Sequence, residues 1–231
     1  MPYETHQSAE NVVLDPPSPP DAAVIWLHGL GADGFDFVPI VEELRLPPTM
    51  AVRFVFPHAR PRPVTINGGF VMRAWYDITS LGADRTEDGA GIRESADVVR
   101  GYIEQENARR IGSERIVIAG FSQGGAIALQ AALRHPQRLA GVMALSTYLP
   151  LRETLETQAA PANRDVPILM CHGTRDPVVP AVLGTSSRDL LQSLGYQVEW
   201  HSYPMEHSVC MEEVLDISKW LQARLAKVPT S

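Results

Sequence analysis

Short apolar runs alternate with stretches of helical periodicity along most of the chain. Runs typical of buried strands fall at residues 22–27, 51–56, 115–119, 139–145, 167–171 and 196–203. Helical patterns fall at residues 36–46, 92–110, 124–134, 181–194 and 209–226. Strands that alternate with helices are joined by right-handed crossovers, so the pattern predicts an α/β fold with a mostly parallel sheet and helices on both faces.

Three stretches depart from this alternation. Residues 1–20 contain a short strand at 11–14 and a proline-rich connector, which reads as a spacer within a single domain spanning residues 1–231. Residues 57–91 are rich in proline and glycine, and residues 64–71 predict a small hairpin turning at Asn67-Gly68, inside what is expected to be a binding loop. The connection at 146–166 is too short for a separate capping domain, which predicts little or no lid.

Composition narrows the classes of function. The 231 residues hold 20 Lys and Arg against 27 Asp and Glu, a net charge of −7 without a basic block, so nucleic acid and anionic lipid surfaces are not expected partners. No apolar run approaches the roughly 18 residues of a membrane span. With no leader-like start and two cysteines, we expect a cytoplasmic globular protein, a monomer or weak homodimer, acting on a small molecule.

One serine lies in a motif typical of a catalytic nucleophile. The sequence Gly120-Phe121-Ser122-Gln123-Gly124-Gly125 stands between an expected strand and an expected helix. A serine at so sharp a turn takes a strained backbone, which needs small neighbours and projects Oγ away from the sheet edge. The alternative is a glycine-rich turn that only packs the helix on the strand. The strand-to-helix context favours Ser122 as nucleophile.

A serine nucleophile needs a base, and the base needs an acid that orients it. In this architecture both follow the nucleophile in the chain and lie at the carboxyl ends of strands. Asp165 precedes the strand at 167–171, whereas Asp176 follows it. Asp176 is therefore the candidate acid, and capping of the next helix is its alternative role.

Seven histidines compete for the role of the base. Five are set aside because they precede the serine, stand at a helix end where a capping or surface role is expected, or end a strand before the acid; these are His6, His28, His58, His135 and His172. His201 falls within the last strand pattern, where a half-buried, satisfied histidine is the simpler role. His207 lies in the loop that follows, from which it can turn toward Ser122, so it is the candidate base.

A second glycine-rich loop follows the first parallel strand. Its sequence, His28-Gly29-Leu30-Gly31-Ala32-Asp33-Gly34, has the spacing of a dinucleotide fingerprint, which offers an oxidoreductase as an alternative of another class. Such a site needs an acid about 20 residues later, and no Asp or Glu lies between Glu43 and Asp77. The loop has instead the composition of an oxyanion-hole wall, where the backbone N–H of Leu30 joins that of Gln123.

Residue types that bind metals occur in two pairs. His207 stands near Cys210, and Cys171 stands beside His172. The two pairs taken together do not have the spacing of the four ligands of a structural zinc site. We therefore expect neither a metal nor an organic cofactor.

These motifs resemble the phospholipase/carboxylesterase family of α/β-hydrolases, which includes bacterial carboxylesterases and eukaryotic acyl-protein thioesterases. The resemblance covers nearly the whole chain after Pro20. Besides the two glycine loops, it rests on Asn67-Gly68-Gly69, Trp75-Tyr76-Asp77-Ile78, Ala144-Leu145-Ser146 and the run from His172-Gly173-Thr174-Arg175-Asp176 to Val179. It implies an α/β-hydrolase fold without a large cap, a triad of Ser122, Asp176 and His207, oxyanion donors at Leu30 and Gln123, and substrate contacts from Trp75, Tyr76 and Leu30.

The residue before the candidate base departs from the family, which usually has glycine where this chain has Glu206. A carboxylate directed inward would raise the pKa of His207 and leave less neutral base, whereas one directed to solvent would do little. Because glycine can also supply an unusual backbone angle, the departure puts the geometry of this loop in question.

The residues and the resemblance together predict a serine carboxylesterase. It would hydrolyse esters of short to medium acyl chains through an acyl-enzyme intermediate, with the substrate held by apolar contacts along residues 57–78. Acyl-protein thioesterase or lysophospholipase activity at the same site is the alternative, since these reactions pass through similar tetrahedral intermediates. A protein that keeps the fold and works by binding alone is the alternative of another class.

Overall fold

A computed structural model describes residues 3–79 and 87–226 of the chain. Its eight-stranded central sheet has the order β1-β2-β4-β3-β7-β8-β9-β10. The strands are β1 (Glu4–Gln7), β2 (Asn11–Asp15), β3 (Ala22–Leu27), β4 (Val52–Pro57), β7 (Ile116–Phe121), β8 (Gly141–Leu145), β9 (Ile168–Gly173) and β10 (Val198–Tyr203). Strands β4, β3, β7, β8, β9 and β10 are parallel, and β1 and β2 pair antiparallel at one edge. The predicted mostly parallel sheet is confirmed.

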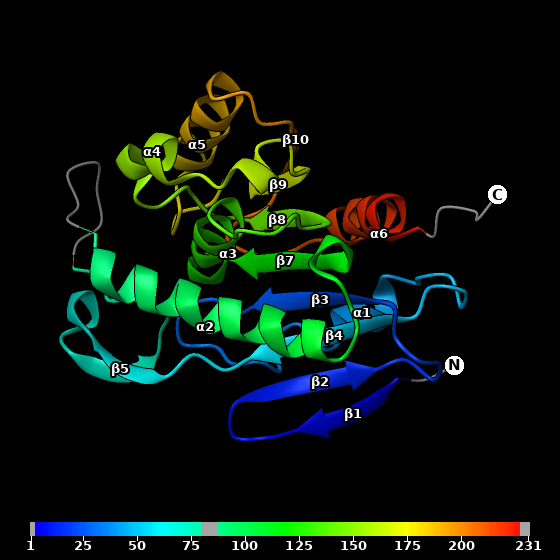
Figure 1. Cartoon of the computed structure of the whole chain (residues 1–231). Coiled ribbons are helices and arrows are strands. Elements are labelled where there is room, and N and C mark those ends of the chain that lie inside the picture. The colour runs from blue at the N-terminus through cyan, green and yellow to red at the C-terminus, as the bar shows by residue number, and fades with distance from the viewer. Residues whose placement is uncertain (1–2, 80–86, 227–231) are drawn as a thin grey trace.

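Helices cover both faces of this sheet. They are α1 (Ile40–Glu43), α2 (Gly89–Ala108), α3 (Gln123–Leu133), α4 (Leu155–Gln158), α5 (Ala181–Ser193) and α6 (Met211–Leu225). Residues of α2, α3 and α5 join one apolar core, and residues of α1 and α6 join the other (Figure 1). The sheet therefore lies between two helical layers, as the alternating pattern predicts.

Burial on both faces explains why the strands read as continuous apolar runs. Every residue of β3, β4, β8 and β9 is buried. Along β3 successive side chains go to opposite faces, so that Ala23, Ile25 and Leu27 enter one core. Their neighbours Ala22, Val24 and Trp26 enter the other. A strand with two dry faces needs no polar positions.

Two elements differ from the sequence pattern. The helix expected at residues 36–46 is a single turn, α1, because the chain before it forms tighter turns. The amides of Val38, Ile40 and Val41 each donate to the carbonyl three residues earlier, the spacing of 3₁₀ turns. Strand β1 was not expected, because its four residues are all exposed and carry no apolar alternation.

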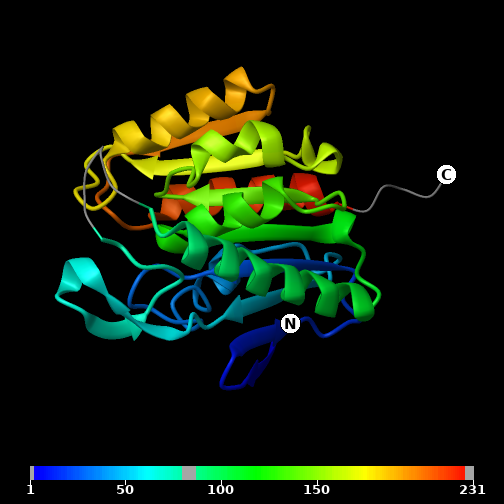
Figure 2. The same cartoon turned by 60° about the vertical axis from the view of Figure 1, so that its left-hand side comes forward.

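The hairpin expected near Asn67-Gly68 is present, with its first strand earlier in the chain than predicted. Strand β5 (Pro61–Val64) pairs antiparallel with β6 (Phe70–Arg73), and residues 65–67 form a 3₁₀ turn. Gly68 and Gly69 follow at φ 67° and 78°, a backbone region that favours glycine. The hairpin projects beyond the carboxyl ends of the parallel strands (Figure 2).

The connection from β8 to β9 carries only short elements. Between the two strands the described chain holds α4 and the 3₁₀ turns Arg152–Thr154 and Pro161–Asn163. No large cap is formed by these residues, as expected. Of the helices within residues 3–79 and 87–226, none is long and apolar enough to cross a membrane.

Candidate active site

The turn between β7 and α3 places Ser122 in a strained backbone conformation, at φ 54° and ψ −120°. The peptide N–H of Ser122 donates to the Leu145 carbonyl (2.8 Å), at the end of neighbouring β8. Its carbonyl accepts from Thr147 Oγ1 (2.6 Å). These bonds from the end of β8 and the residues that follow it hold the strained residue in place. The nucleophile turn expected from the motif is therefore formed.

The glycines around Ser122 are required by close backbone packing. A Cβ on Gly120 would lie 2.3 Å from the backbone of Gly124, on the first turn of α3. A Cβ on Gly124 would lie 2.5 Å from the carbonyl oxygens of Leu27 and His28. The motif thus allows α3 to sit directly on β7 and on the end of β3. Any side chain at these positions would push the nucleophile turn away from the loop after β3.

Replacing Gly124 with Ala is expected to lower the free energy of unfolding by about 1–3 kcal/mol, because backbone atoms must move to admit the methyl group. Gly101→Ala is the matched control, since a Cβ on Gly101 in the interior of α2 meets nothing within 4 Å. Alanine there should stabilise the protein by about 0.5–1 kcal/mol. Urea denaturation of both variants measures the two effects. Equal stability of Gly124→Ala and the native protein would contradict the packing account.

The candidate acid and base form a direct hydrogen bond. His207 Nδ1 lies 2.6 Å from Asp176 Oδ2, and the Asp176 side chain is fully buried. Asp176 Oδ1 accepts from the amides of Val178 and Val179, both at 2.8 Å. Because an ionised carboxylate can only accept, His207 carries its proton on Nδ1. Its Nε2 is then free to accept a proton.

Two loops that carry the acid and the base are tied to each other. The Thr174 amide donates to the Tyr203 carbonyl (2.8 Å), and the Arg175 amide donates to the Met205 carbonyl (3.1 Å). A Cβ on Gly173 would lie 2.4 Å from the Glu206 carbonyl, so the loops are also in close backbone contact. Although they are about 30 residues apart in sequence, the ends of β9 and β10 thus present Asp176 and His207 as one unit.

His207 lies beside the nucleophile turn. Its ring packs against Phe121, the residue before Ser122, with ring centroids 4.7 Å apart. Within the described residues, Ser122 Oγ has no hydrogen-bond partner. The structure therefore joins His207 to Asp176 and packs the His207 ring against the residue before Ser122, without the last hydrogen bond. In free enzymes this bond is often long and tightens when substrate binds.

Two backbone amides are available near Ser122. Neither the Leu30 N–H nor the Gln123 N–H has a hydrogen-bond partner among the residues that the structure describes. Gly31, at φ 77°, donates its N–H to the Arg73 carbonyl (2.9 Å) and so ties the Leu30 loop to β6. Gln123 is the first residue of α3, whose N-terminus favours negative charge. Both donors proposed for an oxyanion hole are thus open.

His28, set aside in the search for a base, supports the Leu30 loop. Its Nε2 accepts from the Ala59 N–H (3.0 Å), which puts the ring proton on Nδ1, and Nδ1 donates to the Gly29 carbonyl (2.7 Å). Burial lowers the pKa of His28 to about 4, so the ring stays neutral near pH 7. The position of His28 directly before a glycine-rich loop is the feature of the sequence that could have indicated this supporting role. Its partner Ala59 was not predictable.

Trp75 and Tyr76 are bound to the helix that follows the nucleophile. Gln123 Oε1 accepts from the Trp75 amide, and Gln123 Nε2 donates to the Tyr76 carbonyl, both at 2.7 Å. Trp75 is 2% exposed, and its indole N–H donates to the His28 carbonyl (2.9 Å). Tyr76 Oη shares a 2.7 Å hydrogen bond with Tyr148 Oη. A substrate contact from either residue stays a prediction.

Glu206 is exposed, and its backbone is not in the left-handed region. The loop before His207 therefore does not need glycine, and the carboxylate lies toward solvent.

The other histidines have structural positions. His172 is buried behind the acid. Its Nε2 donates to the Val179 carbonyl (2.8 Å) and lies 3.6 Å from Asp176 Oδ2. His135, expected in a capping or surface role, is 4% exposed, so the surface role was wrong. His201 is half-buried on β10, as expected.

The glycines of the Leu30 loop have packing roles. A Cβ on Gly34 would lie 2.4 Å from the Phe56 carbonyl, and a Cβ on Gly29 would lie 3.3 Å from the Phe121 ring. The loop is thus pressed against β4 and the nucleophile turn. Over residues 3–79 and 87–226, no group of three or more His, Cys, Asp or Glu side chains is placed to hold a metal ion.

The chain is similar to known proteins over most of its length. A family model described as phospholipase/carboxylesterase matches residues 8–225. The chain is 41% identical to acyl-protein thioesterase 1 of Gibberella zeae, covering 88% of this chain and 91% of that protein. It is 43% identical to acyl-protein thioesterase 1 of Neurospora crassa, covering 90% and 88%.

Solved structures agree with this result. The structure of Zea mays acyl-protein thioesterase 2 superposes with a TM-score of 0.84 at 32% identity, covering 97% of this chain and 100% of the other. Arabidopsis thaliana SOBER1 gives the same TM-score and identity, covering 88% and 99%. The expected α/β-hydrolase fold is confirmed.

Proposed function

Because the chain belongs to the phospholipase/carboxylesterase family of serine hydrolases, we propose that it is an acyl-protein thioesterase, which cleaves the thioester between a fatty acyl group and a protein cysteine. The sequence motifs alone favour carboxylic esters as the substrates. Identity of 41% and 43% to two proteins named acyl-protein thioesterase 1, over most of both chains, is the observation that moves thioesters ahead. Oxygen esters remain the second candidate substrates. The description of the matching family model names phospholipase and carboxylesterase, and both of these enzymes cleave oxygen esters.

Acylation begins with attack of Ser122 Oγ on the thioester carbonyl carbon. His207 Nε2 takes the serine proton, while Asp176, at 2.6 Å from Nδ1, holds the tautomer and stabilises the imidazolium. The carbonyl oxygen becomes an oxyanion, which accepts hydrogen bonds from the amides of Leu30 and Gln123, neither of which has a partner among the described residues. Collapse of the tetrahedral intermediate breaks the C–S bond, and His207 returns the proton to the cysteine sulfur.

Deacylation repeats this chemistry with water. His207 takes a proton from the attacking water, the same two amides receive the second oxyanion, and the proton returns to Ser122 Oγ as the carboxylic acid leaves. No metal is needed for either half of the reaction, because the base, its orienting acid and the oxyanion donors come from the chain itself.

The proposal is tested with two peptides that carry the same acyl chain, one on cysteine as a thioester and one on serine as an oxygen ester. Each kcat/KM is divided by the rate of hydroxide-catalysed hydrolysis of the same peptide, because a thiolate leaves more easily than an alkoxide. We expect the normalised value to be at least about tenfold higher for the thioester, a difference of about 1.4 kcal/mol in transition-state stabilisation. A normalised preference for the oxygen ester would replace the thioesterase assignment with carboxylesterase.

Ser122→Ala is expected to lower the hydrolysis of both peptides by at least about a thousandfold. Ser146→Ala is the matched control. Ser146 also follows a strand at a positive φ (46°) and is fully buried, and its Oγ has no hydrogen-bond partner among the described residues. Its removal should leave hydrolysis within about twofold, because no hydrogen bond is lost. Equal hydrolysis by native protein and Ser122→Ala would refute the serine mechanism, and equal rates at the uncatalysed level would favour a protein that works by binding alone.

A further inference from the structure

The two amides available for an oxyanion come from segments far apart in the sequence. Leu30 lies in the loop after β3, and Gln123 begins α3. An oxyanion hole works only if its donors are held in place before the charge develops, at distances defined to a fraction of an ångström. Something must therefore fix the position of one donor relative to the other.

Trp75 makes a direct connection between these two segments. Its backbone N–H donates to Gln123 Oε1 (2.7 Å), and its indole N–H donates to the His28 carbonyl (2.9 Å), two residues before Leu30. Its carbonyl accepts a hydrogen bond from Ser95 Oγ on α2. All three polar groups of Trp75 are thus engaged, and two of them join the two walls that carry the donors.

The His28 carbonyl is held from two sides. The indole N–H of Trp75 binds it on one side, and the same oxygen is so close to α3 that a Cβ on Gly124 would lie 2.5 Å away. The Trp75 ring also lies beside the His28 ring, with centroids 5.2 Å apart. With this carbonyl fixed, the peptide units that lead to the Leu30 amide have little freedom.

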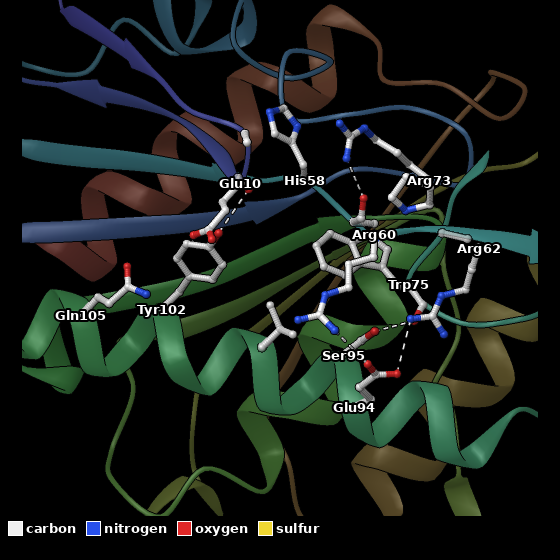
Figure 3. Close-up of a pocket in the computed structure, with 15 residues that line it drawn as sticks. Glu10, His58, Arg60, Arg62, Arg73, Trp75, Glu94, Ser95, Tyr102 and Gln105 are labelled. Atoms are coloured by element: carbon white, nitrogen blue, oxygen red, sulfur yellow. Dashed lines mark hydrogen bonds and ion pairs between the residues drawn. The ribbon is translucent and has the colours of Figure 1, made fainter. Parts of the chain in front are cut away.

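A pocket lined by Trp75, of about 310 Å³, does not resemble an acyl pocket. Arg60, Arg62 and Glu94 are also in its lining (Figure 3). Glu94 forms ion pairs with Arg60 (3.4 Å) and Arg62 (3.5 Å). Neither Ser122 nor His207 is among the lining residues. A fatty acyl chain would gain little by burial against paired charges.

We propose that Trp75 is a positioning residue that couples the two walls of the oxyanion hole through its indole and backbone N–H groups. The inference rests on the proposed function, because it assigns Trp75 to the stabilisation of the oxyanion. It differs from the substrate contact that the family resemblance implies, and the two roles give different kinetics.

Trp75→Phe tests the coupling, because phenylalanine keeps an aromatic ring and the backbone N–H but removes the indole N–H. We expect kcat to fall about tenfold with KM unchanged, the effect of one hydrogen bond that matters in the transition state. The loss should be the same for acyl chains of four to sixteen carbons. The affinity for an alkyl boronic acid, which forms a tetrahedral adduct with serine, should fall by a similar factor.

Trp26→Phe is the matched control. Trp26 is also fully buried, and its indole N–H has no hydrogen-bond partner among the described residues. The substitution removes the same atoms without breaking such a bond, so kcat and boronic acid affinity should stay near the native values. Thermal unfolding of both variants shows whether they are comparably folded.

Each outcome decides between the two roles. An unchanged kcat for Trp75→Phe, or a loss that appears in KM and grows with acyl-chain length, would overturn the coupling role. An equal fall in kcat for Trp26→Phe would overturn it too, since the effect would then come from lost packing. Ser122→Ala, measured in the same assays, tests the proposed function separately: if it keeps native activity, the proposed function fails independently of the result at Trp75.

Discussion

Replacing Asp176 with Asn is expected to lower kcat about 10⁴-fold while leaving the fold intact. Asp176 Oδ1 accepts from the amides of Val178 and Val179, both at 2.8 Å. An Asn side chain must keep its carbonyl oxygen toward these two donors, so its NH₂ group turns to His207 Nδ1. Two donors cannot face each other, and His207 therefore moves its proton to Nε2. In that tautomer it cannot accept the proton of Ser122.

The matched control is Asp165→Asn at the opposite end of β9. The Asp165 side chain is 76% exposed and pairs with Arg138 at the surface. Because exposed ion pairs contribute little, kcat should stay within about twofold of the native value. Steady-state kinetics with one thioester peptide measures both variants. A loss of less than tenfold for Asp176→Asn would mean that the acid does not set the tautomer of His207.

The stability of the protein is expected to fall as the pH rises toward 8, because of Glu213 in the first turn of α6. This residue is fully buried. The Cys171 thiol and the Cys210 backbone are polar neighbours of its carboxyl group, but they offset only part of the cost of burying a charge. Burial raises the pKa of Glu213 from 4.5 to about 8. The folded protein thus holds a proton that the unfolded chain releases. Its contribution is complete below about pH 4.5 and is lost as the pH rises through 8, by about 1.4 kcal/mol per pH unit at most.

Glu213→Gln removes this titration. We expect the variant and the native protein to have similar free energies of unfolding near pH 5, and the variant to be more stable by roughly 4 kcal/mol near pH 8.5. Glu212→Gln, at the exposed neighbouring position, should show no such change between the two pH values. Urea denaturation at both pH values measures the difference. A constant difference would show that Glu213 is ionised in the folded protein.

The sequence pattern was sufficient for most of the sheet because both of its faces are dry. A strand such as β3 has no polar positions, so a run of apolar residues bounded by polar ones locates it. Strand β1 has no buried residue and depends on backbone pairing with β2, which leaves no mark in the pattern. The helix expected at 36–46 is shortened to α1 because residues 35–41 form turns with hydrogen bonds to the carbonyl three residues earlier, and the apolar spacing does not distinguish these turns from a helix.

The candidate site divides along a similar line. Ser122, Asp176 and His207 could be proposed because each follows a recognisable strand, and the order of strands determines which ends meet. The contacts that support them were not predictable. The bond between His28 and Ala59, and that between Gln123 and Trp75, join residues 31 and 48 positions apart through side chains. Such pairings depend on the final packing, and no local pattern reports them.

The strained backbone of Ser122 sets activity and stability against each other at one position. At φ 54° the backbone of Ser122 is strained, and unfolding releases this strain. The strain therefore lowers the free energy of unfolding. Selection for a higher free energy of unfolding alone would replace this turn with one that has an unstrained backbone. Persistence of the strain therefore marks a trade-off, in which resistance to denaturation is given up so that a hydroxyl group is presented to its substrate.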